Sequence, residues 1–121
     1  MRKNIYKYKL EDSHNPRVTG KVVMPLGAEI LSCAMDYNGD IVFYALADPC
    51  EQMKVSMDVV VLPTGASLSE ETQEQIKNMK FEGTFVDCNK NLVWHVWAAV
   101  VELFGRDVYL WKEDLVKEIC K

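Results

Sequence analysis

Residues 91–100, NLVWHVWAAV, hold the side chains with the widest chemical repertoire in the chain, because Trp94 and Trp97 flank His95. An imidazole can exchange a proton, bind a metal ion or hydrogen-bond a ligand, and an indole can stack on a flat ring. On a strand, His95 and Trp97 share one face and Trp94 takes the other, because successive side chains alternate. The histidine is then either a core residue satisfied by hydrogen bonds, or it contacts the polar edge of a planar ligand stacked on one tryptophan.

A second candidate site is the segment 62–69, LPTGASLS, which leads from an expected strand into an expected helix. Backbone N–H groups at a helix start and the helix dipole favour an anion, and the hydroxyls of Thr64 and Ser67 lie on either side of Gly65 as further donors. A phosphate or carboxylate could dock at this turn. The alternative is a plain turn followed by a helix N-cap.

Basic residues gather near the N-terminus. Residues 1–21 carry six Lys or Arg against two acids, whereas the remaining residues carry eight against sixteen, for a net charge of −4. We expect the acidic body to repel nucleic-acid backbones, since phosphate contacts dominate that affinity. Arg17 and Lys21 are candidates to meet a small anion or an acidic partner. The alternative is that the basic residues are solvated positions on an edge strand, where lysines discourage aggregation.

Signatures of catalysis, metal binding and cofactor binding are missing from the sequence. The six glycines never approach G-x-G-x-x-G or P-loop spacing, and no G-x-S-x-G occurs. Without a C-x-x-C pair the cysteines are too widely spaced to suggest zinc, and we expect small apolar side chains in a reducing compartment; they are Cys33, Cys50, Cys88 and Cys120. The sequence therefore predicts a protein that is not an enzyme and needs no metal or cofactor.

The bulk composition predicts one globular domain. The chain has 121 residues, of which 49% are hydrophobic and 26% charged, and these are ordinary values for a domain of this size. Its longest apolar runs fall far short of the roughly twenty residues that span a bilayer. The N-terminal residues lack the apolar core of a signal peptide. We therefore expect a cytoplasmic protein without a membrane span.

Alternation with period two dominates the chain. It predicts a mainly β fold of the α+β type, with about seven mostly antiparallel strands in a sandwich or partly open barrel. Asn38 and Gly39 separate two β-rich runs and predict a hairpin with a type I′ turn. The expected strands cover residues 5–10, 18–24, 28–37, 40–47, 53–62, 81–86 and 92–97.

A short helix is expected between the last strands. Residues 70–79 read as two or three turns on the surface. The helix begins after Ser69, or after Ser67, whose spacing to Glu70 fits a capping box.

A second helix is expected from Asp107 onward, where the period becomes helical. Its apolar positions predict a stripe that packs on the domain or on a partner, including a second subunit; they are Val108, Trp111, Leu115 and Ile119. Residues 98–104 fit either a continued strand or a helical turn. We accordingly divide the chain into a compact β-rich domain, 1–97, and a C-terminal extension, 98–121.

Several motifs resemble, in order, a family of small phage and prophage proteins of uncharacterised function. They are IYKYKL, VVMPLGAEILSC, DIVFYALADP, VLPTGASLS, FEGTFVD and LVWHVW, and together they span roughly residues 4–97. The resemblance implies a compact β-rich fold and a phage-encoded accessory role, and it supplies no catalytic residue. The chain departs from the family pattern at Pro63-Thr64-Gly65, where the family has G-T-G, and at Trp97, where the family has Phe and ends.

The resemblance and the candidate residues lead to two hypotheses. In the first, the protein is an anti-defence binder in the host cytoplasm that sequesters a nucleotide-derived immune signal, as a homo-oligomer that completes the pocket. Aromatic faces would hold the base, and the turn at 64–69 with Arg17 or Lys21 would hold phosphate. In the second, the protein inhibits a host defence protein directly through its acidic surface or its C-terminal helix.

Overall fold

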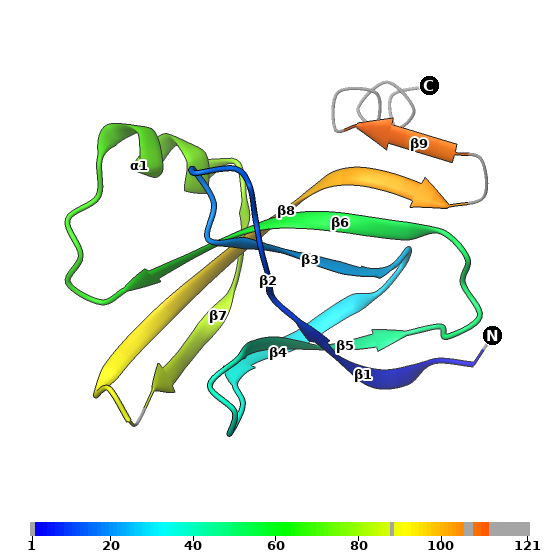
Figure 1. Ribbon diagram of the computed structural model, residues 1–121, viewed down its shortest axis with the longest axis horizontal. Coiled ribbons are helices and arrows are strands. Elements are labelled where there is room, and N and C mark those ends of the chain that lie inside the picture. The colour runs from blue at the N-terminus through cyan, green and yellow to red at the C-terminus, as the bar shows by residue number, and fades with distance from the viewer. Residues whose placement is uncertain (1, 88, 106–107, 112–121) are drawn as a thin grey trace.

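The computed structural model describes residues 2–87, 89–105 and 108–111, which form nine strands and one helix (Figure 1). Six strands precede the helix: β1 (Asn4–Lys9), β2 (Glu11–Asp12), β3 (Gly20–Pro25), β4 (Glu29–Met35), β5 (Ile41–Ala47) and β6 (Lys54–Pro63). The helix α1 (Glu70–Lys77) is followed by β7 (Lys80–Asp87), β8 (Leu92–Gly105) and β9 (Val108–Trp111). No helix of the described residues is long and apolar enough to cross a membrane.

The strands form two antiparallel sheets. The smaller has the order β1-β5-β4, and the larger has the order β2-β3-β6-β8-β7 with β9 paired to β8. The large sheet curls around the small one, and β4 of the small sheet lies against β7 of the large sheet. This arrangement confirms the predicted mainly β fold, a sandwich that is partly open like half a barrel.

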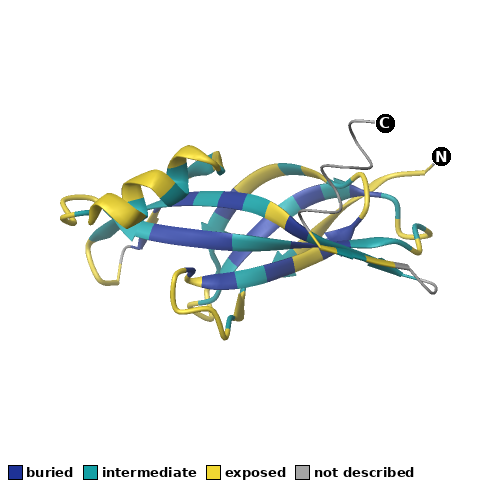
Figure 2. Cartoon of the chain, turned by 90° about the horizontal axis from the view of Figure 1, so that it is seen from above, coloured by how far each residue is buried: buried dark blue, intermediate teal, exposed yellow. Residues whose placement is uncertain are grey.

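The hydrophobic core fills the space between the sheets. On β6, Val55, Val59 and Val61 are buried in this core because they alternate with side chains on the opposite face. Phe43 of β5 contributes the largest fully buried side chain. Figure 2 shows the result, with buried positions along the facing strands and exposed positions on α1 and the loops.

The inserted helix is confirmed as a surface element, since none of its residues is buried. Of the two predicted N-caps, the structure selects Ser69, whose hydroxyl accepts the backbone N–H of Thr72 at 3.1 Å. Asn78 ends the helix.

The predicted hairpin between β4 and β5 is present, but its turn is not type I′. Gly39 has a φ of 85°, whereas Asn38, which type I′ would also place at positive φ, does not. The N–H of Gly39 donates to the carbonyl of Asp36 at 3.0 Å, and the N–H of Asp36 donates to that of Asp40 at 2.9 Å. The loop is therefore three residues long, a type I turn followed by a left-handed glycine.

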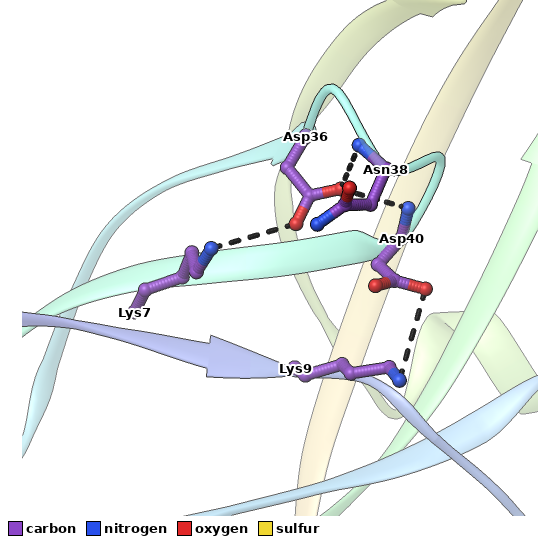
Figure 3. A network of polar contacts seen from close by, with 5 residues as sticks. All are labelled: Lys7, Lys9, Asp36, Asn38 and Asp40. Atoms are coloured by element: carbon purple, nitrogen blue, oxygen red, sulfur yellow. Dashed lines mark hydrogen bonds and ion pairs between the residues drawn. The ribbon is translucent and has the colours of Figure 1, made fainter.

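The carboxylate of Asp36 explains the wider turn (Figure 3). It accepts hydrogen bonds from the backbone N–H groups of Asn38 and Asp40, each at 3.0 Å. These two hydrogen bonds stabilise the three-residue loop over a two-residue loop. Lys7 of β1 approaches the same carboxylate at 3.5 Å, and Lys9 approaches Asp40 at 3.8 Å. These hydrogen bonds, that of the Asp40 N–H foremost, lower the pKa of Asp36.

The prediction of a helix from Asp107 onward is wrong for Val108 and Trp111. Residues 108–111 form β9, which pairs with β8 from Glu102 to Gly105. The ambiguous segment 98–104 continues β8, so this strand runs through the predicted boundary at 97/98. The extended part of β8 has a free edge, and β9 pairs with that edge. Backbone pairing with that edge overrides the local helical spacing. Leu115 and Ile119 lie outside the described residues.

Candidate functional site

The two faces of β8 separate the residues of the first candidate site. Val96 and Ala98 are buried in the core, and Trp94 packs partly buried against the same cluster. His95 and Trp97 therefore lie on the opposite face, which we call the outer face of the large sheet. Only one of the two tryptophans, Trp97, shares a surface with the histidine.

His95 lies between two threonine hydroxyls. Its Nε2 is 2.6 Å from Oγ1 of Thr64, and its Nδ1 is 3.0 Å from Oγ1 of Thr84. Strand pairing sets this arrangement, because Thr84 of β7 lies directly opposite His95, while Leu62 of β6 lies opposite on the other side. Thr64 is held just beyond β6 by its backbone N–H, which donates to the carbonyl of Val93 at 2.9 Å.

This pairing satisfies the imidazole in either protonation state. A neutral imidazole needs one donor and one acceptor, an imidazolium needs two acceptors, and each hydroxyl can serve in both ways. A hydroxyl beside an imidazole also forms half of a nucleophile and base pair, but a carboxylate to orient the ring is missing from the partners of His95 among the described residues. The arrangement is suited to donating and accepting hydrogen bonds at a surface.

An aromatic pair adjoins the histidine on the outer face. The rings of Phe81 and Trp97 meet edge to face, with centroids 5.4 Å apart and an interplanar angle of 64°. Phe81 is 51% exposed, so the pair presents aromatic surface to solvent. Thr64, Thr84, His95, Phe81 and Trp97 together form what we call the outer-face site.

A bulge in β7 brings Phe81 and Thr84 to the same face. Phe81 pairs with Trp97 and Thr84 with His95, and the register shifts between Phe81 and Gly83. Residues three apart on a regular strand would lie on opposite faces. Sequence reasoning missed Phe81 and Thr84. The local signal in the sequence was Gly83, because a glycine inside a strand pattern often marks a bulge. In the structure Gly83 has a φ of 151°.

The turn at 64–67 borders the outer-face site through Thr64. Gly65 takes the left-handed conformation with a φ of 88°, and the N–H of Ala66 donates to the carbonyl of Pro63 at 3.3 Å. The N–H groups of Gly65 and Ser67 make no hydrogen bond with the described residues, and both residues are exposed. The second predicted candidate thus joins the first, since Thr64 belongs to both.

Lys21 and Arg17 lie elsewhere. Lys21 of β3 forms an ion pair of 2.8 Å with Glu102 of β8, and this hydrogen bond lowers the pKa of Glu102 and raises that of Lys21. Glu102 also accepts the hydroxyl of Tyr109 at 3.0 Å. Lys21 is therefore engaged away from His95.

Arg17 lines an open groove of about 910 Å³ between α1, the loop before β3 and strands β6 and β8, which we call the acidic groove. Its charged lining consists of Arg17 and four carboxylates, those of Asp58, Glu70, Glu71 and Glu74. Because Glu70 and Glu71 occupy the first turn of α1, they place negative charge at the positive end of the helix dipole. The groove attracts cations rather than phosphates.

The described residues contain no group of three metal-ligating side chains close enough to hold a metal ion. Cys33 is buried and Cys50 exposed, and both are free thiols. Burial raises the pKa of the Cys33 thiol, so it stays protonated and behaves as a small apolar side chain. Cys88 and Cys120 lie outside the described residues.

The fold and the outer-face site describe a small two-sheet antiparallel β protein with one inserted surface helix. The chain belongs to the family described as a domain of unknown function (DUF7352), whose model matches residues 1–103. No curated protein and no solved structure matches the chain.

Proposed function

We propose that this protein is a small phage-encoded, non-catalytic binding protein that sequesters a nucleotide-derived signal of host defence on its outer-face site. The observation that carries the proposal is the grouping of His95, Thr64 and Thr84 beside Phe81 and Trp97. Aromatic surface suits a nucleobase, and convergent donors and acceptors suit its polar edge. The phage origin comes from the motif resemblance, and the defence target comes from the frequency with which small phage proteins act on host defence.

The charges around the outer-face site limit how much negative charge the ligand can carry. The free N–H groups of Gly65 and Ser67 offer two donors to a phosphate, while Glu70 and Glu71 lie a few residues further along the chain and repel additional negative charge. A cyclic nucleotide, with one charge per phosphate, fits these conditions better than a polyphosphate. A second subunit laid on the exposed aromatic surface would complete the pocket.

Isothermal titration calorimetry with cyclic nucleotides and ADP-ribose derivatives tests the proposal, alongside mass spectrometry of small molecules that co-purify. Thr84→Val keeps the shape of the side chain and removes its hydroxyl, so affinity should fall about three- to tenfold, the effect of one hydrogen bond. Lys21→Met is the matched control and should bind as the native protein does, because Lys21 is paired with Glu102. If no compound in the panel binds at millimolar concentration and none co-purifies, the proposal is wrong.

The acidic groove favours a second candidate function, direct inhibition of a host defence protein through a basic surface of that protein. Long-range attraction of this kind raises association rates and weakens with salt. Replacing Glu70, Glu71 and Glu74 with glutamine should abolish such an association, and nucleotide binding should persist or tighten because two of these carboxylates repel a phosphate. Thr84→Val should do the reverse, so the two variants separate the two functions.

A further inference from the structure

A second groove opens on the inner side of the large sheet, on the face opposite the outer-face site. The chain of β8 extends well beyond the short strand β4, so part of the inner face is left uncovered by the small sheet. The resulting groove of about 530 Å³ lies within the size range of small-molecule sites. We call it the inter-sheet groove.

The floor of the inter-sheet groove is apolar. Met57 and Val100 lie opposite each other on β6 and β8, and Ile30 of β4 and Ala98 of β8 extend the floor toward the core. Val100 is 41% exposed although it is a β-branched apolar residue within β8. The floor therefore offers apolar surface that the described chain leaves open to solvent.

The rim of the inter-sheet groove is charged, and the carboxylate of Glu82 is its main candidate to bind a ligand. Glu29 of β4 and Glu82 of β7 line the groove together with Lys80. Glu82 is only partly exposed and makes neither a hydrogen bond nor an ion pair with the described residues. Burial raises its pKa, and attraction to Lys80 opposes that rise without closing into an ion pair. A half-buried carboxylate without a direct partner is stabilised by a cation that approaches it.

We propose that the inter-sheet groove binds a small amphipathic cation, in which an aliphatic chain covers Met57 and Val100 and an ammonium group pairs with Glu82. The apolar floor selects the chain, and two carboxylates against one lysine select the sign of the charge. This site does not depend on the proposed nucleotide function, because it lies on the other face of the sheet and uses none of the same residues.

The test compares hexylammonium, hexanoate and hexanol, which share a chain and differ in charge, by amide chemical shifts of the full-length protein. Hexylammonium should shift the amides that line the groove and bind more tightly than hexanol, and hexanoate should bind most weakly. Glu82→Gln should weaken hexylammonium about three- to fivefold, the effect of one solvent-accessible charge pair. Glu11→Gln on β2, an exposed carboxylate that lines neither groove, is the matched control and should change this affinity less than twofold. Val100→Lys, at a half-exposed position, should remove binding while the remaining spectrum stays native.

Equal binding of hexanoate and hexylammonium, or full affinity in the Glu82→Gln variant, would overturn the assignment. So would the absence of any groove shift at millimolar hexylammonium. If the groove amides shift on dilution of the protein alone, a second copy of the chain occupies the groove and the small-molecule assignment is wrong.

Discussion

Gly20 is the position where a single methyl group should do most damage to the fold. It lies in β3 between Asp12 of β2 and Val59 of β6 and is buried. A Cβ atom at this position would collide with the carbonyl oxygen of Glu11, and it would lie 2.9 Å from Cγ and 3.0 Å from Cδ1 of Leu10. The leucine can rotate away, but the carbonyl can move only if β2 shifts against β3.

The expected loss of stability for Gly20→Ala is about 2 kcal/mol. Overpacking a filled site costs about 1–3 kcal/mol, and the collision with backbone places this variant in the upper part of that range. Replacing glycine restricts the unfolded chain and returns roughly 0.4–1 kcal/mol. With a typical urea dependence of about 2 kcal/mol per molar for a small domain, the unfolding midpoint should fall by about 1 M.

Urea unfolding followed by the fluorescence of the three tryptophans measures this loss. A double-mutant cycle with Leu10→Ala separates the two kinds of contact, because Leu10 supplies two of the three close atoms. Since the backbone oxygen remains, Leu10→Ala should recover less than half of the cost of Gly20→Ala. The reasoning fails if the stability of Gly20→Ala is within about 0.5 kcal/mol of the native protein, which is the range of ordinary surface substitutions. It also fails if adding Leu10→Ala removes the whole cost of Gly20→Ala.

Three further predictions concern the small sheet. Gly39→Ala should lower stability by about 1–2 kcal/mol because Gly39 has a left-handed conformation, whereas Asn38→Ala should change stability by less than about 0.5 kcal/mol. Equal losses of stability for the two variants in thermal unfolding would indicate a type I′ turn instead. Asp36→Ala should destabilise the protein at neutral pH but not in acid, because a carboxylate with a lowered pKa stabilises the fold above about pH 4 and no longer does so once protonated. The urea midpoints of the variant and the native protein, measured from pH 7 to 2, should therefore converge as the pH falls. Phe43→Ala should cost about 3–5 kcal/mol, while Tyr37→Ala, at a 95% exposed position, should leave the unfolding midpoint unchanged.

Alternation along the chain was sufficient to predict most strands and the mainly β class. The runs that became β3 and β5 bury every second side chain along part of their length, and this pattern is local. The same local logic located α1, since a serine cap and two acids in the first turn stabilise a helix start without help from the core. It also nominated both parts of the candidate site, Thr64 and His95.

Local patterns failed where another strand competed for the backbone. Val108 and Trp111 have helical spacing, but the edge of β8 offers hydrogen bonds to every second peptide and draws them into β9. The turn after β4 failed for a related reason, because the Asp36 carboxylate satisfies two loop N–H groups that the Asn38-Gly39 pattern does not consider.

The sequence by itself therefore determined most of the strands, the helix α1 and which side chains can hydrogen-bond or stack. Tertiary structure alone decided which of them meet. Thr64 reaches His95 only through the register of β6 on β8, and Phe81 and Thr84 share its face only because β7 bulges before Gly83. Register and bulges are set by contacts between residues far apart in the chain, and a one-residue slip would turn every side chain to the other face.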